Sequence, residues 1–145
     1  GFTATNIASD QLAGGGGSGG GITLQGTQVL TLSGTNTYTG GTNIVSGTLL
    51  TSSNASLGDP NFGIVIQNGT LQAGASFTLP RPISLTGAAI IDGNGNNLSL
   101  TGVISGGGSV NFIGMNSVIT LLAANTYSGG TSVGAMTTLV GNTTS

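Results

Sequence analysis

One seven-residue segment that occurs twice sets the strongest limit on how this 145-residue chain can fold. Asn36–Thr42 reads Asn-Thr-Tyr-Thr-Gly-Gly-Thr, and Asn125–Thr131 repeats it 89 residues later with Ser in place of the second Thr. The match extends backward, because Thr31-Leu32 corresponds to Thr120-Leu121 at the same spacing. A chain with a long internal period is typically built from stacked structural units, each of which contacts only its neighbours.

The repeated unit is longer than one coil of a β-solenoid. Gly20–Gly26 aligns with Gly108–Gly114 at a spacing of 88, so degenerate repeats cover residues 20–50 and 108–139. Because one β-helix coil uses about 20–25 residues, the period corresponds to about four coils and the whole chain to about six or seven. We therefore expect residues 1–145 to form a single β-solenoid segment in which residues 1–19 are less regular.

Short alternating segments and frequent turn residues predict the β-structure directly. Val29–Leu32, Ile64–Ile66 and Val118–Leu121 each place apolar residues at every second position, as half-buried strands do. Turn pairs such as Asn68-Gly69 separate them, and 29 of the residues are Gly, which argues against stable helices. The fold class predicted is all-β, without an α-helix longer than two turns.

The inward side chains of such a solenoid should form one narrow apolar column. The residues expected to point inward are Ile22, Leu24, Leu30, Leu32, Ile44, Leu49, Ile64, Ile66, Leu71, Leu79, Leu85, Ile90, Leu98, Leu100, Val110, Phe112, Ile119 and Leu121.

The order of these segments resembles a known family. Residues 30–44 with 46–49, and residues 97–108 leading into the second copy, resemble the autotransporter passenger-associated β-strand repeat. The resemblance implies a right-handed parallel β-helix in a secreted or surface-displayed bacterial protein, with a role in structure and export rather than catalysis. The second copy departs from the pattern at Gly134-Ala135-Met136. The sequence also lacks the family's translocator, so two alternatives stay open: a fragment, or the repeat in another secreted architecture.

The side-chain inventory argues against an enzyme. The chain has no His and no Cys, so Ser-His-Asp and Cys-His nucleophiles are impossible. Arg81 is the one candidate base for a pectin-type lyase, and it stands between two prolines. The three carboxylates, Asp10, Asp59 and Asp92, are scattered, whereas a glycosidase needs two that converge. We predict no enzyme and no catalytic residue, and a single Arg also excludes nucleic acid as a partner.

One segment imitates a calcium loop without completing it. Asp92–Asn96 alternates oxygen-bearing side chains with Gly, but the sixth and twelfth positions of the loop hold Asn97 and Val103 instead of Gly and Glu. A turn between two coils is the favoured interpretation. We therefore predict no metal site and no cofactor-binding residue.

Two other features favour structural over ligand-binding roles. Gly14–Gly21 is interpreted as a lengthened turn, with a flexible linker as the alternative, and a phosphate cradle fails because no Lys follows. Tyr38 and Tyr127 could stack on a sugar. The favoured interpretation is packing at a strand end, with the hydroxyl at the surface.

These observations predict a non-enzymatic structural module of a secreted or surface-displayed protein, acting as a passenger stalk, scaffold or fibre subunit. The alternative is an adhesin or glycan-binding module that uses one sheet wall, and an ice-binding wall ranks last because Thr spacing is irregular. Expected partners are further copies stacked end to end, or adjoining coils of a longer polypeptide; a host or cell-surface glycan is the other candidate. No apolar run reaches the roughly 18 residues that span a bilayer, so the chain is not expected to span a membrane. The resemblance to the passenger repeat implies that its location is extracellular or the bacterial cell surface.

Overall fold

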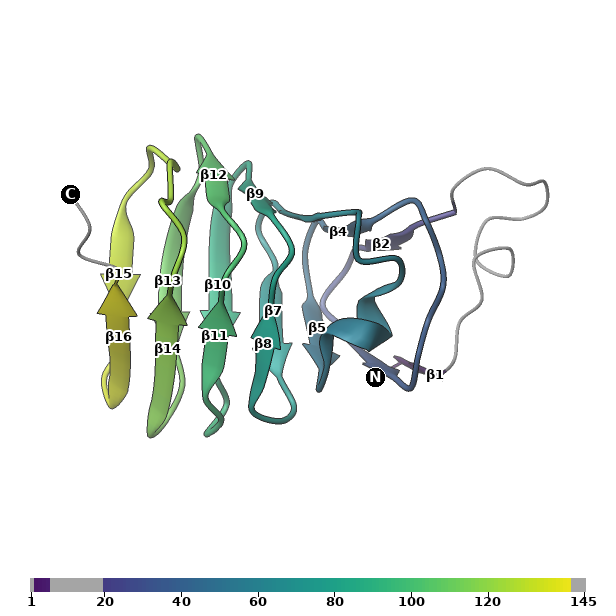
Figure 1. The fold of residues 1–145 in the computed structure, drawn as a ribbon, viewed down its shortest axis with the longest axis horizontal. Helices are drawn as coiled ribbons and strands as arrows, with labels where there is room; N and C mark the ends of the chain where they lie inside the picture. Colours follow the sequence, from purple (N-terminus) through teal and green to yellow (C-terminus); the bar gives the residue numbers. More distant parts are fainter. Residues whose placement is uncertain (1, 6–19, 142–145) are drawn as a thin grey trace.

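The computed structural model, described here for residues 2–5 and 20–141, is a parallel β-solenoid of about six turns (Figure 1). Its strands lie in three parallel sheets, which we call walls A, B and C. Wall A contains β1 (Phe2–Thr5), β3 (Val29–Ser33), β5 (Thr48–Thr51), β7 (Thr70–Ala73), β10 (Ala88–Asp92), β13 (Ser109–Ile113) and β15 (Thr131–Val133). Wall B contains β2 (Ile22–Leu24), β4 (Thr42–Ile44), β6 (Ile64–Ile66), β9 (Ile83–Leu85) and β12 (Ile104–Gly106). Wall C contains β8 (Phe77–Leu79), β11 (Leu98–Leu100), β14 (Ser117–Leu121) and β16 (Thr137–Gly141).

The predicted all-β parallel solenoid is confirmed. Every strand pair in the described chain is parallel, and the one helical element is the single-turn 3₁₀ helix η1 (Asn54–Leu57). The expectation of a less regular segment at residues 1–19 lies outside the described residues, apart from β1. Within residues 2–5 and 20–141, no helix is long and apolar enough to cross a membrane.

Strand register gives the length of one coil. On wall A, Leu30 pairs with Leu49, and the same position continues through Leu71, Ile91 and Phe112. The steps are 19, 22, 20 and 21 residues, so the inward side chains stack like on like despite unequal coils. This stacking fills the core column without helices and satisfies the backbone between coils.

The long repeat turns out to be four coils plus one wall. Four register steps on wall A, from Leu30 to Phe112, take 82 residues. A period of 89 residues therefore places the second copy seven residues further along the coil, on the next wall. The first copy accordingly places β2, β3 and β4 on walls B, A and B, whereas the second places β13, β14 and β15 on walls A, C and A. The motif therefore forms on two different sets of walls in the same solenoid.

Of the residues expected to point inward, 17 are buried and one, Ile90, is not. Strand β10 instead turns Ala89 and Ile91 into the core, where Ile91 pairs with Leu71 and Phe112. Adjacent isoleucines carry no alternation from which to choose a face, so the ladder with neighbouring coils decides it.

Side chains join the coils at the corners. The Ser76 hydroxyl oxygen accepts a hydrogen bond from the Asn97 backbone N–H at 2.9 Å, and Asn97 Oδ1 accepts one from Val118 N–H at 3.1 Å. Asn125 Oδ1 likewise accepts from Ile104 N–H at 2.8 Å. Polar residues at the corners thus continue the coil-to-coil ladder where the strands end.

Candidate functional site

Two loops take the place of wall C in the first coils, and the most polar part of the interior lies between them. Residues 34–41 connect β3 to β4, and residues 52–63 connect β5 to β6 through η1. The Asn36 N–H donates to the Ala55 carbonyl at 3.0 Å, and the Asp59 N–H donates to the Tyr38 carbonyl at 2.9 Å. The loops therefore stack coil on coil, as strands would, but with irregular backbone.

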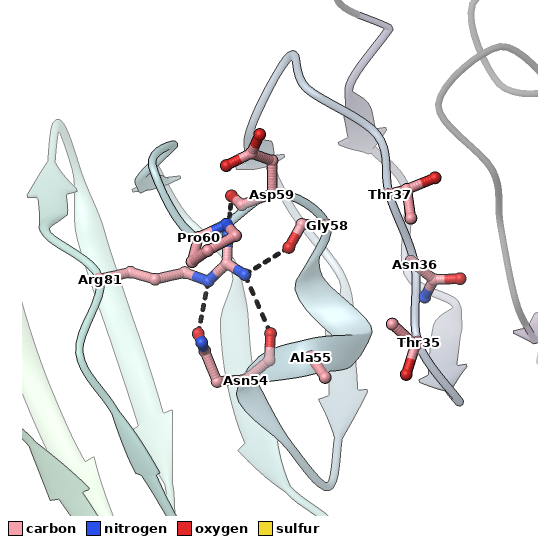
Figure 2. Close-up of a pocket in the computed structure, with 9 residues that line it drawn as sticks. All are labelled: Thr35, Asn36, Thr37, Asn54, Ala55, Gly58, Asp59, Pro60 and Arg81. Atoms are coloured by element: carbon pink, nitrogen blue, oxygen red, sulfur yellow. Dashed lines mark hydrogen bonds between the residues drawn. The ribbon is translucent and has the colours of Figure 1, made fainter.

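Arg81 holds the second of these loops from the coil beyond it (Figure 2). It follows β8, the edge strand of wall C, and only 2% of its surface is exposed. Nε donates to Asn54 Oδ1 at 2.6 Å, Nη1 to the carbonyls of Asp59 at 2.6 Å and Phe62 at 3.1 Å, and Nη2 to the carbonyls of Asn54 at 2.9 Å and Gly58 at 2.6 Å. These five bonds use all five N–H donors of a guanidinium.

This environment makes Arg81 a clamp and not a base. Burial lowers the pKa of Arg81, while Tyr38 and Asp59 act in the opposite direction. Because the usual pKa of Arg lies so far above neutrality, the group stays protonated at pH 7. A lyase base must accept a proton, and Arg81 has neither a free lone pair nor an unoccupied N–H with which to approach a substrate. Its charge instead orients carbonyl dipoles around one turn of loop.

The two carboxylates in the described part of the chain, Asp59 and Asp92, do not form the pair that a glycosidase requires. Asp59 Oδ1 accepts two hydrogen bonds from Asn61, from N and Nδ2, both at 2.9 Å. Asp92 lies in another coil, where its Oδ2 accepts from Gln72 Nε2 at 2.8 Å. Asp10 lies outside the described residues. Each described carboxylate thus serves its own turn.

The segment Asp92–Asn96 is a turn between β10 and β11. Asn94 has a positive φ of 49°, and its N–H donates to Asp92 Oδ1 at 2.8 Å. The side-chain amides of Asn94 and Asn96 both donate to the Ala73 carbonyl, at 3.2 and 3.3 Å. These amides direct N–H groups toward the neighbouring coil. Among the described residues, no group of three or more His, Cys, Asp or Glu gathers where it could hold a metal.

The repeated Tyr-x-x-x-Thr spacing forms the same contact in both copies. Tyr38 OH lies 2.7 Å from Thr42 Oγ1, and Tyr127 OH lies 2.6 Å from Thr131 Oγ1. The predicted surface position of the hydroxyl is wrong for Tyr38, which is fully buried, because the loop of the next coil covers it. Burial raises the pKa of Tyr38, and the hydrogen bond to Thr42 partly opposes this. Tyr38 therefore cannot present its ring to a sugar.

A pocket of about 400 Å³ lies between the two loops (Figure 2). Asn36 and Thr37 face it from one side, and Asn54, Asp59 and Arg81 from the other. The Asn36 amide donates to the Ser56 carbonyl at 2.6 Å, and the Arg81 donors are fully engaged. The lining polar groups that could recognise a ligand are thus largely occupied by the clamp itself.

The structure describes only the end of the glycine-rich segment Gly14–Gly21. The turn predicted at Gly14–Gly21 lies outside the described residues except for its last two glycines. A Cβ on Gly21 would lie 2.7 Å from the carbonyl oxygens of Gly40 and Gly41, so a side chain there would collide with the next coil.

Comparisons with known proteins agree with this geometry. A family model described as the passenger-associated-transport-repeat matches residues 22–51 and 118–135. The chain is also 39% identical, over 109 residues, to the protein named "Adhesin BmaC autotransporter" from Brucella suis biovar 1 (strain 1330). The chain belongs to the autotransporter passenger-repeat family. The aligned region is 74% of this chain but spans only 3% of that relative's length, and no solved structure matches.

The passenger-repeat matches fall on the two copies of the motif, which lie on different walls of the solenoid. Residues 22–51 contain β2 to β5, and residues 118–135 contain most of β14, the second Tyr loop and β15. Membership in this family makes the chain a passenger module that is surface-exposed or secreted.

Proposed function

We propose that this passenger module is a non-enzymatic length of rod whose end faces pair with further coils. The observation that carries the proposal lies at the end of the described solenoid, where β15 and β16 are the last strands of walls A and C (Figure 1). Val133 continues the inward position of Phe112, and Leu139 that of Ile119. Phe112 and Ile119 are fully buried, whereas Val133 is 46% exposed and Leu139 is partly exposed.

The two Tyr loops show what covering such an end does. The loop of Tyr38 is stacked against residues 55–59 of the next coil, and the Tyr38 side chain is fully buried. The loop of Tyr127 has no such coil beyond it among the described residues, and its Tyr is only partly buried. An exposed ladder edge with apolar side chains is a template for another parallel strand. We propose that a second copy, or an adjoining coil of a longer polypeptide, supplies it.

The non-enzymatic part of the proposal rests on the described charged residues, which all have structural partners. Arg81 is fully engaged in holding a loop, and Asp59 and Asp92 serve separate turns. A rod needs none of these groups to react, because its task is to maintain distance and shape.

The test compares two substitutions on one strand. Ser132 and Val133 are neighbours on β15, but only Val133 occupies the core position. We expect the parent chain to form larger species as concentration rises in sedimentation velocity, with end-to-end rods in electron microscopy. Val133→Asp should abolish them, because a charge cannot pair across an apolar end, and Ser132→Asp should keep them. A parent chain that stays monomeric at all concentrations, with both ends protected from hydrogen exchange, contradicts the proposal.

A second candidate function is adhesion through an outer wall. The observation that favours it is the 39% identity to a Brucella suis relative that is named as an adhesin. The outer face of wall B carries polar side chains on three of four successive strands, in the row Asn43, Val65, Ser84 and Ser105. Binding of the purified chain to host cells, compared with a chain unfolded by heat, tests it.

A further inference from the structure

The outer face of wall B has a hollow of about 310 Å³ beside the loop that Arg81 holds. Its floor is a row of outward side chains in register, with Asn43 next to Val65 and then Ser84 and Ser105 on successive strands. Phe62 also lines the hollow and is 41% exposed.

The backbone of Phe62 is held in place by hydrogen bonds within the protein. Its carbonyl accepts from Arg81 Nη1 at 3.1 Å, and its N–H donates to the Asp59 carbonyl at 3.2 Å. A Cβ added to Gly41, which has a φ of 76°, would lie 3.2 Å from the Gly63 carbonyl oxygen and 3.7 Å from Phe62 Cβ. Gly41, which belongs to the repeated motif, therefore lets the loop of residues 52–63 approach wall B closely.

The chemistry of the lining selects a neutral ligand with both apolar and hydroxyl surface. Phe62 and Val65 offer apolar contacts, and Ser84 and Ser105 offer hydroxyls that donate or accept. Asn43 Oδ1 is buried and has no hydrogen-bond partner in the described chain, so a hydroxyl that reaches it after rotation of the amide would satisfy it. None of the described residues that line the hollow is charged, which disfavours ions and charged peptides.

We propose that this hollow binds one neutral pyranose unit of a glycan. The C–H face of the sugar packs on the Phe62 ring, and its hydroxyls meet Ser84, Ser105 and the amide of Asn43. A small apolar site with a few placed polar groups is the usual form of a binding pocket. This inference rests on the adhesive candidate function and assigns it a position and a ligand class.

The second copy of the motif supplies an internal control. A comparable hollow of about 430 Å³ lies on wall A beside Gly130 and Thr131, with Ile90 and Asn111 in its lining. None of its lining residues in the described chain is aromatic. The Gly-Gly-Thr segment thus leaves a depression in both copies, and the aromatic side chain is what distinguishes the first.

The experiment measures binding of neutral and charged sugars by saturation-transfer NMR and calorimetry. Probes are glucose, galactose and N-acetylglucosamine oligosaccharides of two to four units, with sialyllactose as a charged comparison. We expect at least one neutral series to bind, and Phe62→Ala to weaken it by about tenfold or more through loss of ring contact. Phe62→Tyr should retain binding, and Ile90→Ala, in the other hollow, should leave it unchanged.

Three outcomes overturn the inference: no neutral sugar binds at millimolar concentration, only the charged sugar binds, or Phe62→Ala binds like the parent. Far-UV circular dichroism verifies that Phe62→Ala folds, as its exposed ring predicts. Rod formation measured by sedimentation should not respond to Phe62→Ala, so failure of the sugar site and failure of the rod are separable. Cell binding that persists in Phe62→Ala would leave adhesion standing and remove this hollow as its site.

Discussion

Arg81 binds Asn54 twice, with Nε donating to the side-chain oxygen at 2.6 Å and Nη2 to the carbonyl oxygen at 2.9 Å. The two residues are 27 positions apart in the chain and lie on successive coils. The contact joins the edge of wall C, at β8, to the η1 turn that replaces wall C in the preceding coil. It thus closes the solenoid at the point where a regular strand is missing.

Arg81→Met should destabilise the fold strongly. The change leaves four buried or partly buried carbonyls and one amide oxygen without their donor, so we expect a loss of about 3–5 kcal/mol. Arg81→Lys keeps the charge but cannot reproduce a planar five-donor fork. Its stability should therefore lie between that of the parent and that of Arg81→Met. Urea unfolding followed by circular dichroism gives these values. Gln72→Met, which removes one partly buried hydrogen bond to Asp92, is the control and should cost under about 1 kcal/mol. If Arg81→Met cost no more than this control, the clamp would be refuted.

The two Tyr–Thr contacts should differ in energy although they have the same geometry. Tyr38→Phe leaves the buried Thr42 hydroxyl without its partner, and should cost about 1–2 kcal/mol. Tyr127→Phe should cost only about 0–0.5 kcal/mol, because water reaches the exposed Thr131. Double-mutant cycles with Thr42→Val and Thr131→Val isolate each pair. Equal coupling energies in the two cycles would contradict this explanation.

Stability should decline at alkaline pH, in part through Tyr38. Burial raises the pKa of Tyr38 in the folded state above its usual 10.0, so the unfolded chain loses that proton first. The stability that this difference contributes is fully present below pH 10 and is lost as pH rises through the folded-state pKa. We expect the unfolding free energy of Tyr38→Phe to depend less on pH between about 9 and 11 than that of the parent. A steeper or identical pH profile for the variant would show that burial does not raise the pKa of Tyr38.

Removal of divalent metal should leave the fold unchanged. The Asn94 and Asn96 amides are bonded to the Ala73 carbonyl, and the Asp92 carboxylate is occupied by Gln72 and the Asn94 N–H. We expect the same melting temperature in EDTA and in calcium, measured by scanning calorimetry. An ion at this turn would be established if the melting temperature of the parent fell in EDTA and recovered with calcium, while that of Asp92→Asn did neither.

The sequence predicts the architecture well because its signals are local. Alternation finds most of the inward side chains, and the repeated motif indicates a solenoid. The clamp is harder to find, because Arg81 acts on residues 19 to 27 positions away through backbone carbonyls, which carry no sequence signal. The available clue is that the chain's only basic side chain stands between two prolines in an almost uncharged sequence. A lone charge in such a chain indicates a specific set of partners.

The offset of the repeat by one wall also lies beyond sequence reasoning. Aligning Gly20–Gly26 with Gly108–Gly114 is correct as a sequence match, yet the first segment forms wall B and the second wall A. Because coil lengths vary from 19 to 22 residues, the period alone does not reveal that the second copy lies one wall, or a third of a turn, further around the solenoid. Register between coils, and not the motif, fixes which wall a strand joins.

The orientation of β10 gives a direct test of that register. Ile91 stacks between Leu71 and Phe112 in the core, whereas Ile90 faces outward between Thr70 and Asn111. Ile91→Asp buries an unpaired carboxylate in the column and should cost about 3 kcal/mol or more. Ile90→Asp should cost under about 1 kcal/mol, because its side chain keeps contact with water. Both substitutions introduce the same charge one residue apart, so differences in unfolded-state effects largely cancel. Urea midpoints compare the two variants directly, and a reversed order would place β10 one residue out of register with its neighbours.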